Sequence, residues 1–110
     1  MIRAHIATLV YTKEVTAAVK ADQFVGFDGA PAGADGLVEG IAKTDGEAGD
    51  PVSLIALGLL ELSAPAPIAV GDLVYSDADG KPTSTGANNP VGVCNRAAVN
   101  PGDTVTILTR

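Results

Sequence analysis

Few side chains in this 110-residue sequence could do chemistry, and they do not form a catalytic pattern. His5 is the one histidine, so any catalytic triad, dyad or zinc site would have to include it. It stands alone near the N-terminus, where a non-catalytic strand or arm residue is expected. The serines lack the glycine-flanked elbow that exposes a hydrolase nucleophile. The sequence therefore predicts no catalytic residues and no enzyme.

The acidic turn Asp77-Ala-Asp-Gly80 raises the question of a calcium site. If Gly80 took the sharp-turn position of an EF-hand loop, the first ligand would be Tyr75 and the final glutamate would be Gly86. Neither provides the carboxylate that those positions require. The turn is instead typical of a β-hairpin tip, where Gly80 can take a positive φ. We expect no metal and no cofactor.

Lys81, directly after this turn, suggests an alternative function. Biotinyl and lipoyl carrier domains also present a lysine on a β-hairpin, but within Met-Lys-Met or Asp-Lys-Ala. Here Pro82 follows the lysine. A small β-barrel binding or carrier module within a larger complex is therefore the second hypothesis. A covalent cofactor on Lys81 would distinguish it.

Charge and hydropathy exclude several classes of partner. Seven Lys and Arg against 13 Asp and Glu give a net charge of -6, and the basic residues are scattered. They form no stripe that could neutralise successive phosphates, so nucleic acid is not expected. The longest apolar stretch, Val52–Leu60, is too short to span a bilayer. The first residues lack the apolar core of a signal peptide, so synthesis in a cytoplasm without a membrane partner is expected.

Candidate strands recur at short intervals and are rich in Val, Ile, Leu and Thr. They are Ile6–Thr12, Gln23–Phe27, Leu37–Lys43, Val52–Leu57, Leu59–Leu62, Asp72–Ser76, Pro90–Asn95 and Thr104–Thr109. Gly- and Pro-rich turns separate them, and no segment has a convincing helical pattern. The sequence predicts one all-β domain, a small β-barrel or sandwich of about eight short strands. The single cysteine, Cys94, excludes an internal disulfide and is expected to be buried.

One turn solution occurs three times. Gly49-Asp50, Gly71-Asp72 and Gly102-Asp103 each stand immediately before an apolar strand. Glycine can supply a left-handed backbone, and aspartate can accept local backbone hydrogen bonds where the strand starts. We predict a positive φ for Gly71, Gly102 or both. Together with Gly80, these pairs are the expected structural turns.

From about residue 23 to the end, the sequence resembles the family of phage capsid cement, or decoration, proteins. Three passages carry the resemblance by their order and spacing: Gly49–Leu62, Ile68–Lys81, and Pro90–Cys94 followed by Ala97-Ala98 and Gly102–Leu108. The second is similar to the family's most regular signature, a Gly-Asp turn, an apolar strand with tyrosine, and an Asp/Gly/Lys hairpin. The resemblance implies a small trimeric β-barrel or sandwich on an icosahedral shell, without catalytic residues.

The function implied by this resemblance is structural. We expect a virion protein that decorates and stabilises a phage capsid from its outer surface, after synthesis in the host cytoplasm. Its expected partners are the major capsid protein and copies of itself in a homotrimer. The net negative charge suits a surface that does not bind the genome.

Residues 1–22 are less typical of the family and form a separate expectation. We predict an N-terminal arm or edge strand here and the barrel in residues 23–110; the alternative is an ordinary first strand within the chain's own barrel. An extended form is favoured over a helical turn in Thr12–Asp22, because the segment is short and Val15, Thr16 and Val19 are β-branched. The segment is apolar on both sides and holds three of the seven basic residues, so it is expected to contact a neighbouring subunit or the shell. The expected contact residues are Arg3, Ile6, Leu9, Tyr11, Lys13 and Lys20.

Overall fold

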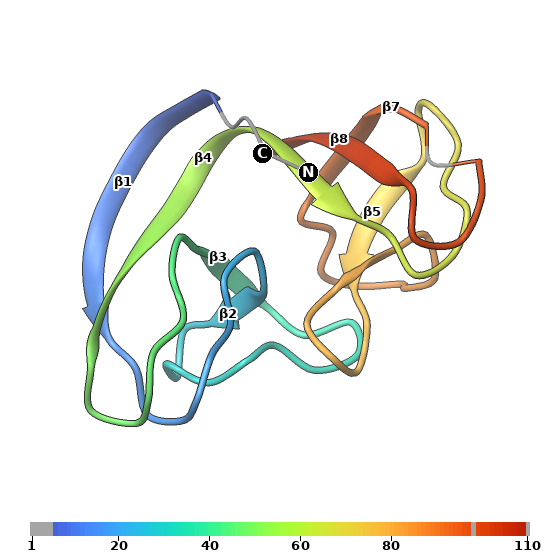
Figure 1. Ribbon diagram of the computed structural model, residues 1–110. Helices are drawn as coiled ribbons and strands as arrows, with labels where there is room; N and C mark the ends of the chain where they lie inside the picture. The colour runs from blue at the N-terminus through green and yellow to red at the C-terminus, as the bar shows by residue number, and fades with distance from the viewer. Residues whose placement is uncertain (1–5, 98, 110) are drawn as a thin grey trace.

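A computed structural model describes residues 6–97 and 99–109, which contain eight β-strands and no helix (Figure 1). The strands are β1 (Ile6–Glu14), β2 (Phe24–Gly26), β3 (Val38–Ala42), β4 (Pro51–Ser63), β5 (Leu73–Ser76), β6 (Pro82–Thr83), β7 (Gly92–Arg96) and β8 (Thr104–Thr109). Every pairing is antiparallel, in the order β2-β3-β4-β8-β7-β5-β6, with β1 added to β4. The strands form one nearly closed barrel-shaped sheet, which confirms the predicted fold class.

Strand β4 organises this sheet. It is 13 residues long, although the sequence predicted two strands, Val52–Leu57 and Leu59–Leu62. That division was wrong because Gly58 keeps its place in the ladder: it lies opposite Ala7, and its N–H donates to Thr109 Oγ1 at 2.7 Å. One edge of β4 pairs with β1, and the other pairs first with β3 and then with β8. The chain's first and last strands thus both pair with β4.

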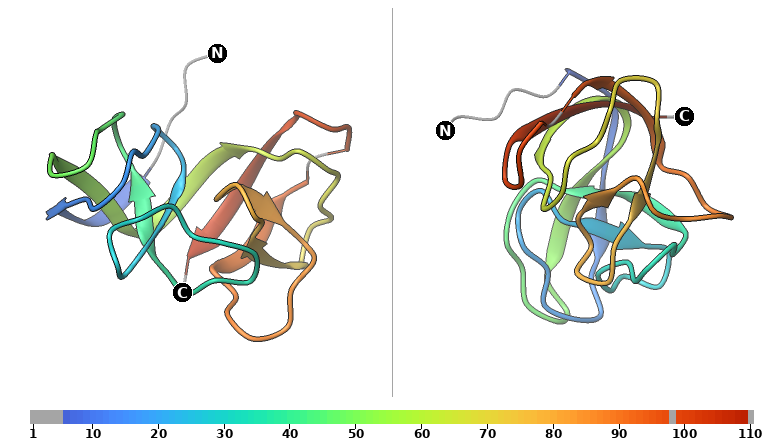
Figure 2. Two further views of the ribbon diagram at one scale, coloured as in Figure 1. Left: turned by 90° about the horizontal axis from the view of Figure 1, so that it is seen from below. Right: turned by 90° about the vertical axis from the view of Figure 1, so that its right-hand side faces the viewer.

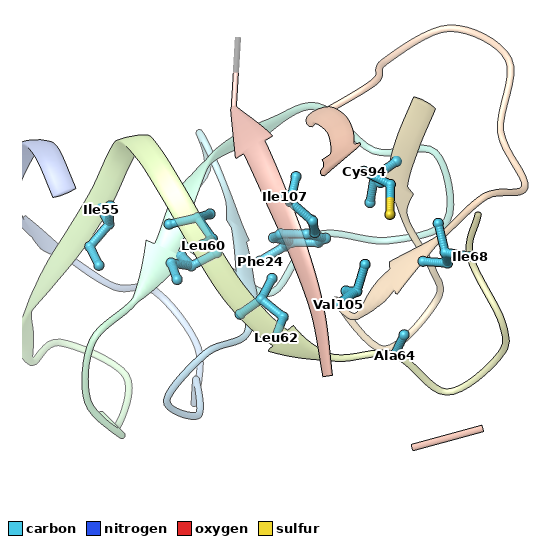
Figure 3. Close-up of a cluster of buried hydrophobic side chains, with 12 residues drawn as sticks. Phe24, Ile55, Leu60, Leu62, Ala64, Ile68, Cys94, Val105 and Ile107 are labelled. Atoms are coloured by element: carbon cyan, nitrogen blue, oxygen red, sulfur yellow. The ribbon is translucent and has the colours of Figure 1, made fainter. Parts of the chain in front are cut away.

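The apolar character of β4 on both faces has a direct explanation. Two hydrophobic clusters flank the strand, so that Leu54 belongs to the smaller cluster and its neighbour Ile55 to the larger one. The larger cluster includes Phe24, Leu60, Leu62 and Ile107 and fills the barrel (Figure 3). Both Leu54 and Ile55 are therefore buried inside a single chain.

Backbone hydrogen bonds outside the named strands bring the barrel close to closure. Phe24 N–H, at the start of β2, donates to Gly80 O at 2.8 Å, and Asp35 N–H donates to Ser76 O at 2.9 Å. The hairpin β5–β6 is the one predicted from Asp77–Gly80, and Gly80 has φ +73°. Strand β6 has only two residues and was not predicted.

A carboxylate that the sequence did not single out holds the loop between β6 and β7. Asp35 accepts hydrogen bonds from the backbone N–H groups of Ala87, Asn88 and Asn89, at 3.0–3.2 Å for the shortest contact of each. The Asn89 amide donates back to Asp35 O at 3.0 Å. These bonds, led by the one from Asn89, lower the pKa of Asp35 from its ordinary 3.8. Asp35 also has a positive φ of 51°, a conformation that is uncommon for a residue other than glycine.

Candidate interaction surface

Within 6–97 and 99–109, no three His, Cys, Asp or Glu side chains gather where a metal ion could be held. His5 lies outside the described residues. In the same ranges, no helix is long and apolar enough to cross a membrane.

Strand β1 lies at an edge of the sheet. Among the described strands, it pairs only with β4, so its other edge has no strand partner (Figure 1). Leu9 is 44% exposed and Val10 is 42% exposed, unusually high for neighbouring aliphatic residues of one strand. An exposed apolar edge strand is a template for pairing with another chain.

Two of the expected contact residues, Tyr11 and Lys13, both contact Glu39 of the same chain. The Tyr11 hydroxyl donates a short hydrogen bond to Glu39 Oε2 of β3, and Lys13 Nζ lies 2.9 Å from Glu39 Oε1. Glu39 Oε1 is buried and accepts no hydrogen bond of regular geometry within the described chain. The Lys13 ammonium lies close enough to be the counterion of this oxygen. The hydrogen bond to Glu39, then burial and the carboxylate charge, raise the pKa of Tyr11 above 10.0.

The other expected contact residues lie elsewhere. Arg3 is outside the described residues. Ile6 pairs with Leu59, but its side chain is not described, and Leu9 pairs with Leu57. Lys20 is exposed and separate from the Tyr11–Lys13 pair. The structure therefore joins two of the six residues and leaves Lys20 in a second location.

That second location is a shallow pocket of about 210 Å³ between two loops and the end of β4. Lys20 and Lys81 both line it, together with Asp22 and Ser63. The Gln23 side chain holds the two lysine-bearing turns together: its Oε1 accepts the Lys20 N–H at 3.0 Å, and its Nε2 donates to Asp79 O at 2.9 Å. Lys81 thus lines the same pocket as another lysine.

A row of aliphatic side chains on the outer face was missed by the sequence analysis. Successive cross-strand pairs join Leu59 of β4 to Leu108 of β8, Leu108 to Val93 of β7, and Val93 to Leu73 of β5. We call these four residues the aliphatic row. Cross-strand partners share a face, and the buried residues Leu60, Ile107, Cys94 and Val74 alternate with them on the inner face. The sequence did contain a signal for this row, because hydrophobic residues occupy both the inward and the outward positions of these strands.

The three Gly-Asp pairs form one kind of turn. Gly49, Gly71 and Gly102 have φ of 91°, 88° and 86°, as predicted for the last two, with ordinary φ in the non-glycine residues before them. Each aspartate N–H donates to the carbonyl three residues earlier, at 3.0–3.1 Å, as in a type II turn.

The aspartate side chains complete these turns. Oδ2 of Asp50, Asp72 and Asp103 accepts the N–H of that same earlier residue, at 2.9 Å, 3.2 Å and 3.0 Å respectively. Each glycine N–H donates a hydrogen bond to a carbonyl of a neighbouring segment and so fixes the turn there. Gly102 N–H, for example, donates to Ala64 O at 2.7 Å. The turns therefore position strands β4, β5 and β8, which carry the outer face.

Comparisons with known proteins agree with this architecture. A family model described as phage cement protein matches residues 2–109. No curated protein matches the chain. Among solved structures, the chain is similar to the head fiber gp8.5 N base of bacteriophage phi29, with a TM-score of 0.74 and 20% sequence identity over 93% of each chain. At this identity, the likeness shows a shared fold.

Proposed function

The chain belongs to the phage cement protein family and is a phage virion structural protein, and from this premise we propose that it binds the outer surface of an icosahedral capsid and stabilises the shell. The role is non-enzymatic, with the major capsid protein as partner and the capsid exterior as location. The observation that carries the proposal is the family match over residues 2–109 of a single barrel.

Several physical features support a cement role. The nearly closed sheet gives a rigid body, since few strand edges are left unpaired. The net charge of -6 disfavours binding to the genome. A repeated shell presents many equivalent sites, so that a homotrimer gains avidity from contacts that are individually weak.

Within this role, residues 1–22 act as an arm or edge strand that contacts a neighbouring subunit or the shell. Support comes from the unpaired edge of β1 and from the exposed side chains of Leu9 and Val10. Lys13 has an acidic partner, Glu39, in its own chain, so among the described basic residues of this segment the exposed Lys20 is the one proposed to meet an acidic partner elsewhere.

The test is binding to shells that lack the protein. Expanded capsids are mixed with the purified chain and sedimented, and the bound fraction and the melting temperature of the shells are measured. We expect saturable binding and a higher shell melting temperature. A chain that stays in the supernatant at all concentrations would refute capsid binding.

A truncation lacking Met1–Val10 tests the role of the N-terminal segment. We expect it to keep its far-ultraviolet circular dichroism and lose binding. Loss of the folded state in the isolated truncated chain would instead assign the segment to the barrel and contradict the arm proposal.

A further inference from the structure

The aliphatic row is an exposed apolar surface in a place where polar residues are expected. An antiparallel sheet with its inner face on the core normally turns polar side chains outward. Here Leu108 is 48% exposed and Leu73 is 45% exposed, at the outward positions of β8 and β5. On the far side of Leu59, the exposed pair Leu57 and Leu9 extends the surface to β1. Contiguous apolar surface of this kind marks an interaction site.

The surface has a defined direction and length. The aliphatic row crosses β4, β8, β7 and β5, and Leu57 and Leu9 extend the surface to β1; these strands are neighbours in the sheet (Figures 1 and 2). With strands about 4.8 Å apart, the surface is roughly 19 Å long. Such a surface suits the dry centre of a contact, whose rim is polar.

The adjoining row of the same face carries opposite charges at its two ends. Thr106 of β8 pairs with Glu61 of β4 on one side and with Arg96 of β7 on the other. A carboxylate therefore marks the β4 end of this adjoining row, and a guanidinium marks its β7 end; below, the β4 end and the β7 end are the ends of this row. Arg96 is exposed.

This arrangement makes the surface complementary to a second copy of itself. When the β4 end of one copy packs against the β7 end of another, leucine meets leucine or valine, and Glu61 meets Arg96. Copies of a chain with net charge -6 repel one another, so that an uncharged row flanked by one charge of each sign is the favourable place for them to meet. A contact between unlike ends closes into a ring when the rotation permits it.

We propose that the aliphatic row, with Glu61 and Arg96 at its rim, is the contact between copies of this chain, arranged so that the β4 end of each copy packs on the β7 end of the next. The inference rests on the proposed homotrimer and names the face that forms it. The partner that covers this face is a second copy of the chain, and the capsid shell binds to another part of the surface.

The first test uses sedimentation velocity of the full chain at micromolar concentration. Leu73→Lys places a charge in the row, and Leu37→Lys is the matched control, since Leu37 is 61% exposed in the loop before β3 and outside the row. We expect the parent and Leu37→Lys to associate equally and Leu73→Lys to associate at least tenfold more weakly. Equal association of all three, with unchanged circular dichroism, would overturn the inference.

The second test exchanges the rim charges, which leaves the core untouched. Arg96→Glu and Glu61→Arg are each expected to weaken association several-fold, and the double variant is expected to restore it. Failure of the double variant to recover, when both single variants are weakened and folded, would overturn the proposed arrangement.

Shell sedimentation separates this inference from the proposed function. If Leu73→Lys self-associates like the parent but no longer binds shells, the row is a shell contact, so that the inference fails while the cement role stands. If the parent is a monomer that binds shells, the inference also fails and the cement role stands. If the parent forms the oligomer through the row yet binds no shell, the inference holds and the cement role fails.

Discussion

Replacing Gly102 by alanine tests the turn geometry most directly, because the structure isolates one cause. Gly102 has φ +86°, and a Cβ built there would meet nothing within 4 Å. The substitution therefore adds backbone strain without a steric clash. An L-residue in the left-handed region costs about 1–2 kcal/mol, and the stiffer unfolded chain returns about 0.4–1 kcal/mol. We expect a net loss of about 1 kcal/mol in the free energy of unfolding.

The assay is thermal or urea unfolding at one fixed protein concentration, because self-association makes the midpoint concentration-dependent. For a domain of this size, 1 kcal/mol corresponds to a fall of about 5 °C in the midpoint. Gly33→Ala is the matched control, since Gly33 also has open space for a Cβ but does not have a positive φ. It should be neutral or slightly stabilising. If both variants shift the midpoint equally, positive φ does not determine the effect and the reasoning is wrong.

Three further predictions concern single side chains. Because hydrogen bonds hold the pKa of Asp35 below 3.8, its contribution is present above about pH 4 and is lost as the pH falls through the lowered pKa; the stability gap between the parent and Asp35→Asn, measured by thermal unfolding, should narrow as the pH is lowered below 3.8, and a gap that does not narrow would contradict this. Burial raises the pKa of the Cys94 thiol, so a thiol reagent at pH 8 should react far more slowly with the native chain than with the urea-unfolded chain; equal rates would show that Cys94 is accessible. Tyr11→Phe removes the hydrogen bond to Glu39 and should lower the free energy of unfolding by about 0.5 kcal/mol at pH 7. Because the pKa of Tyr11 is raised, this difference should vanish as the pH rises well above 10. A variant as stable as the parent at pH 7 would refute a stabilising bond.

Features set by neighbouring residues could be predicted from the sequence. The Gly-Asp turns and the hairpin at Gly80 depend on residues within a few positions of one another, and the structure has a positive φ at each predicted glycine. The strands lie close to their expected positions because short apolar runs bounded by Gly and Pro have few alternatives. The single helical turn held as an alternative in Thr12–Asp22 does not form, since β1 continues to Glu14 and irregular chain follows.

Features that depend on register could not be predicted. Asp35 lies 52–54 positions from the amides that it accepts, and nothing local indicates that loop. The aliphatic row exists only because β4, β8, β7 and β5 pair in one particular alignment; a shift of one residue would turn Leu108 inward. Likewise, Lys13 could be recognised as a basic residue of the N-terminal segment, but its pairing with Glu39 required the three-dimensional sheet.

The meeting of the first and last strands on β4 constrains when the chain can fold. Ile6 and Leu108 both align with Leu59, in the middle of the sequence, so the centre of the sheet is assembled from the most distant parts of the chain. During synthesis, β4 leaves the ribosome about forty residues before β8, and its C-terminal half then lacks the neighbour that covers one edge. Native pairing of this half of β4 must wait until β8 has been synthesised, which makes folding slow and leaves a nascent chain that is prone to aggregate. Loss of even the last strand would therefore lead to aggregation of the chain rather than to a slightly smaller barrel.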